Sequence, residues 1–531
     1  MIRVNNIHLS LDYDDKSVRK AVAQQLRIEE KSIKSCTIFR RSVDARKKDN
    51  IYFLTTVDAE LNINEDKVCK KCGNAQIAKK YEYNQMKFGN APSPVVVGAG
   101  PAGLFATLIL ARSGANPILI ERGRDVDRRT ADVNRFWTSG QLDTTSNVQF
   151  GEGGAGTFSD GKLNSGTKDI RQRKVLEEFV SHGAPDEILY NAKPHIGTDM
   201  LKGTIKNIRN EIIELGGMVM FETKLVSMAF SDNKLKSITV ETANGDEIIE
   251  TDNVILAIGH SARDTFEMLY DLKLPIEAKP FSVGARIEHL REKIDKAQYG
   301  RFAGNKKLGS ANYKLSMHLD NGRGVYTFCM CPGGKVVNAS SEENRLCTNG
   351  MSEFARDAEN SNSALLVGIN PDDYESDHPL AGMYLQRRLE SKAFVAGGEN
   401  YNAPIQRVDD FLNNRKSTHL GDVKPSIGPN YEFSNLNEIL PEYVSTSMAQ
   451  GIVKMGRMLH GFDDGDAVLT GIESRSSSPV RIMRKSDTLE SILIEGLYPC
   501  GEGAGYAGGI ISAAVDGIKC AEKIIEKSNK N

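Results

Sequence analysis

Two cysteines separated by one residue are the first feature of this sequence that could do chemistry. Cys329 and Cys331 end a strand-like stretch and precede the turn sequence PGG at residues 332–334. Side chains two positions apart on a strand point to the same face, so both thiols are expected on one side. An exposed thiol with a lowered pKa can act as a nucleophile or redox group. Two buried structural thiols are the alternative interpretation.

A second group combines cations with carboxylates. Arg286 and Glu288 follow a predicted strand and are expected on one face of it, where they could bind an anionic substrate and move a proton. A surface ion pair is the alternative. Glu473 and Arg475 are expected to line the same cleft. The residues predicted to be catalytic are Arg286, Glu288, Cys329, Cys331 and Lys162.

The elements that would position these groups centre on the sequence GAGPAG at residues 98–103. It follows the apolar strand PVVV and opens an apolar helix, and Glu121 ends the next predicted strand 23 positions after Gly98. This context is typical of a dinucleotide site. Gly98 permits the tight turn, Gly100 lets the backbone approach a pyrophosphate, and Gly103 lets the helix pack on the strand. A glycine-rich turn without a ligand is the alternative.

A second glycine cluster near the end of the chain favours FAD over NAD. The sequence GLYPCGEGAGYAGG at residues 496–509 precedes a helix that starts at Ile510, and Glu502 is expected near the pyrophosphate and ribityl chain. The positive end of that helix suits negative charge at the flavin N1/C2 carbonyl on reduction. The apolar strand at residues 254–259 is expected to close the same domain. A flexible loop is the alternative interpretation of the cluster alone.

A third cluster, GEGGAGTFSDGK at residues 151–162, is predicted to pass close to the isoalloxazine ring, and Lys162 at its end is expected to approach N5. A turn without a ligand is the alternative interpretation. No second strand–GxGxxG–helix unit and no CxxxxC pair occurs in the sequence, so a separate NAD(P) domain is not expected. FAD is the predicted cofactor. The residues predicted to contact it are Gly98, Ala99, Gly100, Pro101, Ala102, Gly103, Glu121, Arg122, Gly154, Ala155, Gly156, Val226, Gly259, Gly501, Glu502, Gly509 and Ile510.

Several long motifs resemble a family of uncharacterised bacterial FAD-dependent dehydrogenases, sometimes called NAD(FAD)-utilizing dehydrogenases. The resemblance covers nearly the whole chain and implies an FAD fold with an inserted second domain, but no known substrate. No residue supports the NAD of the family label. The motifs are RRSVDAR (40–46), VGAGPAGL (97–104), NVQFGEGGAGTFSDGKL (147–163), KPHIGTD (193–199), KPFSVGARIEH (279–289), FCMCPGG (328–334), GIESRSSSPVR (471–481) and the C-terminal glycine cluster.

The predicted fold class is α/β. It comprises an FAD-binding Rossmann-like domain of the glutathione reductase type, an inserted α+β domain and a small N-terminal α+β domain. Residues 1–90 are assigned to the N-terminal domain and 91–275 to the first part of the FAD-binding domain. Residues 276–465 are assigned to the inserted substrate or cap domain, and 466–531 to the C-terminal part of the FAD-binding domain.

The net charge, the apolar runs and the cysteines limit the classes of protein to which this sequence is expected to belong. The 531 residues carry a formal net charge of −2, and the sequence shows neither a secretory leader nor an apolar run of membrane-spanning length. A cytoplasmic protein with reduced thiols is expected. Cys69 and Cys72 form a lone CxxC without the second pair of a zinc ribbon, so no metal site is predicted.

Two functional hypotheses follow. The first is an FAD-dependent oxidoreductase, a dehydrogenase or reductase, that acts on a small-molecule substrate with an external electron donor or acceptor. The second is an RNA-linked flavoprotein that docks RNA through its N-terminal domain, where Arg40, Arg41, Arg46, Lys47 and Lys48 cluster. The near-neutral charge and the lack of a basic stripe favour the first, so a nucleic-acid partner is not expected.

Overall fold

A five-stranded parallel sheet carries the dinucleotide motif. The computed structural model describes residues 1–164, 166 and 168–530. The strands run in the order β23-β11-β5-β6-β7, and every neighbouring pair is parallel. Their bounds are β5 Val95–Val97, β6 Ile118–Ile120, β7 Met218–Met220, β11 Val254–Leu256 and β23 Leu497–Pro499. From β5 the chain builds the sheet first toward β6 and β7 on one side and later toward β11 and β23 on the other. Ligands bind at the carboxyl ends of the strands where the strand order reverses in this way, so a ligand is expected beside the carboxyl end of β5.

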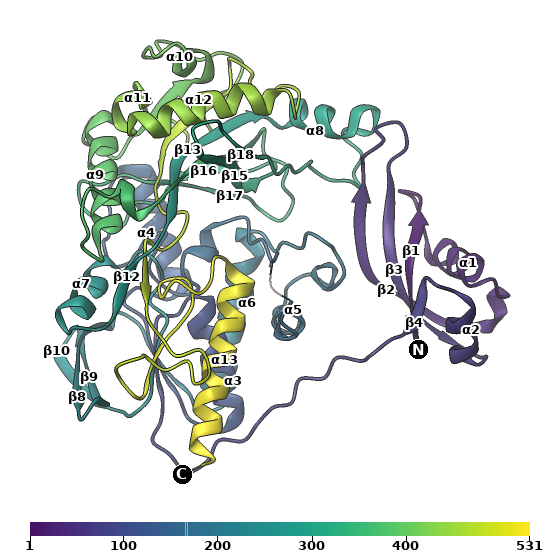
Figure 1. Ribbon diagram of the computed structural model, residues 1–531, viewed down its shortest axis with the longest axis horizontal. Coiled ribbons are helices and arrows are strands. Elements are labelled where there is room, and N and C mark those ends of the chain that lie inside the picture. The colour runs from purple at the N-terminus through teal and green to yellow at the C-terminus, as the bar shows by residue number, and fades with distance from the viewer. Residues whose placement is uncertain (165, 167, 531) are drawn as a thin grey trace.

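Two buried helices pack against each other on this sheet. Helix α3 (Pro101–Ser113) is the apolar helix that the GAGPAG motif opens, and α13 (Ile510–Ser528) lies beside it (Figure 1). A Cβ on Gly517 would lie 2.0 Å from the Ala102 carbonyl oxygen. Only glycine permits this approach, so the two helices pack backbone to backbone.

The second layer is a seven-stranded sheet in the order β14-β15-β18-β13-β21-β19-β20. The expected boundary at residue 465 precedes β21, which lies inside this sheet. Its strands are β13 Phe281–Leu290, β14 Ser316–His318, β15 Gly324–Cys331, β18 Asn360–Ile369, β19 Ala403–Arg407, β20 Tyr431–Phe433 and β21 Val468–Glu473. The helices of this part are α8 Arg291–Tyr299, α9 Ala381–Ala396, α10 Val408–Leu412, α11 Leu436–Ile439 and α12 Glu442–Gly456.

The N-terminal residues form a four-stranded sheet in the order β2-β3-β1-β4. It lies to one side in Figure 1, and an extended segment leads from it to the parallel sheet. Backbone hydrogen bonds join it to the rest: Arg41 N donates to the Tyr190 carbonyl at 2.7 Å. Its elements are β1 Ile2–Leu9, α1 Asp15–Leu26, β2 Ile33–Asp44, β3 Tyr52–Leu61, α2 Glu65–Lys71 and β4 Ala75–Ile77.

Smaller elements complete the scaffold. Strands β8, β9 and β10 form an antiparallel sheet, β12 pairs with β22, and β16 pairs with β17. The bounds are α4 Val126–Ser139, α5 Arg171–Ser181, α6 Thr198–Glu214, β8 Lys224–Ser231, β9 Lys234–Thr242, β10 Gly245–Glu250, α7 Arg263–Asp271, β12 Ile276–Ala278, β16 Lys335–Asn338, β17 Thr348–Met351 and β22 Val480–Ile482.

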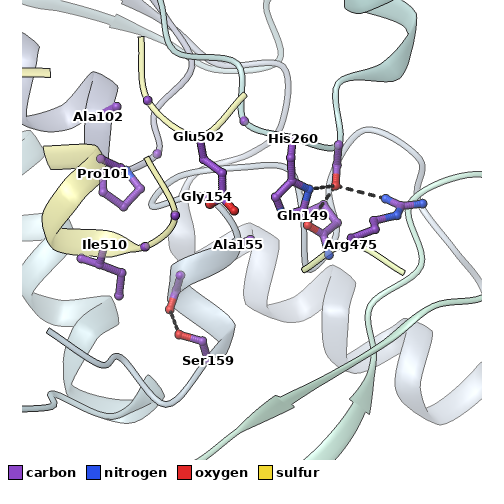
Figure 2. A pocket seen from close by; sticks show the side chains of 18 of the residues that line it. Pro101, Ala102, Gln149, Gly154, Ala155, Ser159, His260, Arg475, Glu502 and Ile510 are labelled. Atoms are coloured by element: carbon purple, nitrogen blue, oxygen red, sulfur yellow. Dashed lines mark hydrogen bonds between the residues drawn. The ribbon is translucent and has the colours of Figure 1, made fainter. Parts of the chain in front are cut away.

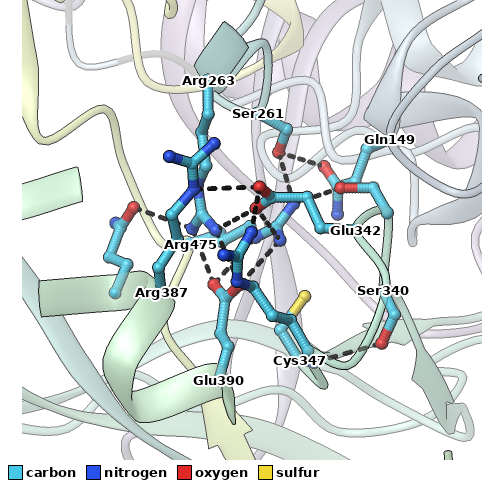
Figure 3. Close-up of polar contacts among 12 residues, drawn as sticks. Gln149, Ser261, Arg263, Ser340, Glu342, Cys347, Arg387, Glu390 and Arg475 are labelled. Carbon is cyan, nitrogen blue, oxygen red and sulfur yellow. Dashed lines mark hydrogen bonds and ion pairs between the residues drawn. The ribbon is translucent and has the colours of Figure 1, made fainter. Parts of the chain in front are cut away.

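A buried charge network ties the two layers together (Figure 3). Glu390 on α9 accepts two hydrogen bonds from Arg263 on α7, both 2.7 Å, and two from Arg475 after β21, at 2.9 and 2.8 Å. Arg263 also contacts Glu342 at 2.5 Å. Burial acts to raise the pKa of Glu390, but the two guanidinium groups outweigh it and hold this pKa well below its usual range.

We expect Glu390→Gln to lower the free energy of unfolding by about 3–5 kcal/mol, because two buried guanidinium groups lose their shared counterion. Urea unfolding followed by circular dichroism measures this. The matched control is Glu375→Gln, whose ion pair with Arg388 is exposed on both sides and is worth at most about 1 kcal/mol. Equal losses in the two variants would contradict a linking role for the network.

Candidate functional site

A cavity of about 660 Å³ lies between the carboxyl edge of the parallel sheet and the seven-stranded sheet. Its size is typical of a small-molecule or cofactor site. The parallel-sheet part contributes glycine-rich backbone to the wall, including Gly98, Gly100 and Gly154. The seven-stranded sheet contributes functional side chains, including Cys329 and Glu473. The cavity therefore joins the predicted dinucleotide site to the predicted catalytic groups.

The backbone around the start of α3 leaves room for a ligand. A Cβ on Gly100 would meet only the Gly154 Cα, at 3.9 Å, and a Cβ on Gly259, Gly508 or Gly509 would meet nothing within 4 Å. These open positions all line the cavity. The amides of the first turn of α3 have no partner inside the helix and suit phosphate oxygens. This arrangement fits the pyrophosphate of a dinucleotide.

Glu121, predicted to contact the cofactor, lines the cavity and also organises the backbone around it. Its carboxylate accepts hydrogen bonds from the amides of Ala99 at 2.8 Å, Gly151 at 2.9 Å and Gly123 at 3.0 Å. One side chain thus ties the first glycine cluster to the 151–162 loop. Arg122 beside it donates to Thr265 Oγ1 at 2.8 Å and lines the cavity too.

The 151–162 loop is shaped by an arginine that sequence reasoning did not identify. Arg129 on α4 is fully buried and donates to the carbonyls of Asn147 at 2.8 Å, Val148 at 2.9 Å and Glu152 at 2.6 Å. A guanidinium with five donors suits several carbonyls at once. The sequence shows Arg129 only as a charged residue on a helix near a glycine-rich loop. That pattern is too common to identify Arg129 as a functional residue.

The predicted flavin contacts in the loop and the C-terminal cluster meet on one cavity wall. Gly154, Ala155 and Gly156 line it together with Gly501, Glu502, Gly509 and Ile510. Figure 2 shows Glu502 between Pro101 and His260. Burial raises the pKa of Glu502 to about 7, Lys279 partly offsets this, and Cys329 adds to it. This carboxyl group can therefore exchange a proton near neutral pH.

Three members of the predicted cofactor set do not line the cavity. Val226 does not line the cavity, whereas Thr223 and Leu225 do, because residues two positions apart in an extended chain point to the same side and Val226 lies between them. Ala99 and Gly103 act through the backbone. A Cβ on Gly103 would lie 1.8 Å from the Gly98 carbonyl oxygen, so this glycine permits the close packing of α3.

Cys329, Lys162, Glu473 and Arg475 all lie on the cavity wall. Arg286 does not, since it is fully buried behind them. It donates to Glu473 Oε2 at 3.0 Å and to the Cys329 carbonyl at 3.0 Å. The expectation that Arg286 binds an anionic substrate directly is corrected: it positions two groups that line the cavity.

Glu288 was expected beside Arg286 and does not reach the cavity. It is fully buried and accepts hydrogen bonds from the Asn360 amide side chain at 3.1 Å and from the Ser426 backbone amide at 3.2 Å. The two residues do lie two positions apart on β13. That spacing moves Glu288 about 7 Å along the strand. There Asn360 and Ser426 already donate hydrogen bonds to its carboxylate.

Cys331 also departs from the expectation. The pairing of β15 with β18 shifts between Phe328 and Cys331, and Cys329 has φ +40°. This bulge breaks the simple alternation. Cys329 lines the cavity, whereas Cys331 is fully buried behind it. The Cys331 thiol donates to the Cys329 carbonyl at 3.3 Å and accepts from Arg286 Nη2 at 3.5 Å.

The surroundings of Cys329 favour a thiolate. The adjacent Cys331 side chain lowers the pKa of Cys329 most, and the positive charges of Lys162 and Arg286 lower it further, so that together they outweigh burial, which acts to raise it. Burial raises the pKa of the neighbouring Glu473 to about 7 against the opposing charge of Arg286. A nucleophilic sulfur and a proton-exchanging carboxyl group thus share one wall at neutral pH.

Alkylation of the purified protein by iodoacetamide should label Cys329 with a pH midpoint clearly below the ordinary thiol value, because the thiolate is the reactive form and the pKa of this thiol is lowered. Peptide mass spectrometry at a series of pH values gives the midpoint. The buried Cys347, whose pKa burial raises to about 12, serves as the unreactive internal control. A Cys329 midpoint near the ordinary value of 9.0 would show that the thiolate is not stabilised.

Gly100→Val should abolish FAD binding, because a branched side chain would fill the open space beside α3. Flavin absorbance that co-elutes with the protein after gel filtration with excess FAD measures this. Gly73→Val is the matched control, since a Cβ there meets nothing within 4 Å and the residue lies in the N-terminal unit, away from the cavity. If both variants retained FAD equally, the ligand would bind elsewhere.

Comparison with known proteins adds family evidence to this geometry. Residues 280–476 match the family model described as the C-terminal domain-like part of FAD-dependent proteins. Residues 1–60 match a domain of unknown function. An uncharacterised protein from Clostridium beijerinckii is 50% identical over 99% of this chain and 99% of its own length. FAD, the cofactor named by the first family, is the group that the glycine-lined cavity fits.

Two solved structures share a distantly similar chain course with this protein. A flavin-dependent brominase is 12% identical, with 83% of this chain and 80% of that chain covered and a TM-score of 0.38. A geranylgeranyl bacteriochlorophyll reductase-like protein from Thermoplasma acidophilum is 12% identical, with 84% and 83% covered and a TM-score of 0.38. Likenesses this low carry no conclusion about chemistry. Among the described helices, none is long and apolar enough to span a membrane.

Proposed function

This chain belongs to the same family as the uncharacterised Clostridium beijerinckii protein, and we propose from that premise that it is an FAD-dependent oxidoreductase acting on a small organic molecule. The observation that carries the proposal is the shared cavity. Glycine-lined backbone suited to FAD and the side chains of Cys329 and Glu473 line one continuous space. A site that only stored the cofactor would not need polarised thiol and carboxyl groups beside it.

The residues of the chain have separable roles in this proposal. Bound FAD supplies the two-electron chemistry. The amides at the start of α3 hold the pyrophosphate, and the start of α13 presents its positive end to the cavity. Glu473 exchanges a proton with the substrate, and Cys329 contributes a negative charge or a nucleophile at the same wall. Arg286 is a positioning residue, because it acts through these two groups.

The sequence resemblance suggests a dehydrogenase, which passes electrons from the substrate to an external acceptor. A reductase, which passes electrons from an external donor to the substrate, would use the same groups.

The RNA hypothesis gains no support from the N-terminal unit. Arg46 is paired with Asp44, and Arg41 donates to Asn191 Oδ1 at 3.1 Å and to Tyr13 Oη at 3.0 Å. These arginines serve intramolecular contacts.

Anaerobic mixing of the FAD-loaded protein with NADH, NADPH and a panel of metabolites should reveal a reductant that bleaches the flavin absorbance. With that reductant, Cys329→Ser and Glu473→Gln should retain FAD but slow bleaching by about 100-fold or more, the usual effect of losing an acid–base group. Cys36→Ser in the N-terminal sheet is the matched control. Unchanged bleaching in both site variants would contradict their roles, and FAD-loaded protein that no compound reduces would contradict an oxidoreductase.

A further inference from the structure

One part of the cavity wall carries an excess of positive charge. Lys162, Lys193, Lys314 and Arg356 all line the cavity, and the charge of Lys162 also acts on Cys329. The carboxylate that pairs with two of them is Asp160: Arg356 Nε donates to its Oδ1 at 2.8 Å, and Lys162 Nζ lies 3.7 Å from its Oδ2. We call this region, defined by the four cations, the cationic lobe.

The cationic lobe is built where the two layers of the molecule meet. Lys162 ends the glycine loop, and its backbone forms a bridge with His195, which brings the 193–195 segment alongside. Arg356 and Lys314 come from loops of the part that carries the seven-stranded sheet. The side chains of four separate segments thus converge on one space, which surface lysines scattered on one element would not do.

Lys162 is the cation whose charge is least satisfied. Its Nζ is shielded from solvent yet has no hydrogen-bond partner among the described residues. The 3.7 Å separation from Asp160 is too long for a hydrogen bond, and the oxygens of Asp160 already accept from Arg356 and Ser352. A buried ammonium group without an acceptor costs free energy, so a ligand acceptor is the simplest explanation of this geometry.

The neighbouring groups repel one another in the absence of an anion. Burial lowers the pKa of Lys193, and the charges of Lys162 and Arg356 lower it further. Burial also lowers the pKa of His195 to about 4, with a further contribution from Arg356, so this imidazole is neutral at pH 7. An anion placed among these side chains would relieve the repulsion and accept hydrogen bonds.

We infer that the cationic lobe binds an anionic group of the substrate, a carboxylate or a phosphate, with Lys162 as a direct donor. This inference rests on the proposed function, since it assigns a substrate class to that site. It also replaces Arg286, which is buried behind the wall, as the anion-binding residue. The anionic group would anchor the substrate while the rest of the molecule lies beside Cys329 and Glu473.

Three ring compounds of similar shape test the charge requirement directly: benzoate, phenyl phosphate and the neutral benzamide. Each is titrated into the FAD-loaded protein at constant ionic strength, with isothermal calorimetry for affinity and flavin absorbance for proximity to the cofactor. We expect benzoate or phenyl phosphate to bind and to perturb the flavin bands, and benzamide to bind at least roughly tenfold more weakly, the loss expected for a charge-assisted hydrogen bond. The tighter of the two anions identifies a carboxylate or a phosphate preference.

Lys162→Gln should weaken binding of the preferred anion by roughly tenfold or more with the FAD content unchanged. Lys306→Gln, a matched change at an exposed lysine outside the cavity, should not. Equal affinity for anion and amide, no binding of either anion, or equal effects of the two substitutions would each overturn the inference. Calorimetry detects anion binding without the flavin. Protein that binds the anion but not FAD would therefore refute the proposed function but would still support anion binding by the cationic lobe.

Discussion

The close approach of backbone to backbone at the start of α3 is the constraint on which the rest of the structure depends. Gly103 packs on Gly98, Gly517 packs on Ala102, and Gly100 lies against Gly154 at the cavity wall. A side chain at the first two contacts would separate α3 from the sheet and from α13. A side chain at Gly100 would instead occupy the space left for a ligand. Helix packing and ligand binding therefore both require glycine at these positions.

The site exists only where the two layers meet, so their connections matter as much as the glycines. Glu390 joins Arg263 and Arg475 across the layers, and Asp160 joins the glycine loop to Arg356. Behind the wall, Arg286 contacts both Glu473 and Cys329. Each connection pairs a buried charge with an opposite one, which fixes geometry because moving either partner leaves a charge unsatisfied.

Local sequence was sufficient for the glycine-lined half of the site. The positions that need glycine or an acidic residue are set by short-range geometry, so Gly98, Gly100 and Glu121 could be identified from spacing alone. The parallel strands beside them are continuous apolar runs, and the turn at Gly245 has the positive φ of +106° that its hairpin requires. These features depend on few long-range contacts.

The half of the site that carries the functional side chains depends on contacts between residues far apart in the sequence. Helices α9 and α12 lie in the inserted α+β domain assigned to residues 276–465, for which no individual helix was predicted. A bulge between Phe328 and Cys331 broke the alternation used to place the two thiols. Glu288 kept the expected spacing but lay too far along β13. Arg129 has no distinctive motif, since its partners are carbonyl groups whose positions only the folded loop defines.

The central claim is that this fold holds FAD non-covalently in the glycine-lined cavity, and acid precipitation of the purified protein tests it most directly. The protein should be yellow, and after precipitation the supernatant should contain FAD in a one-to-one ratio to the chain while the pellet is colourless. Flavin that remained in the pellet would contradict non-covalent binding. Colourless protein that could not be reconstituted with FAD would contradict the account of the cavity altogether.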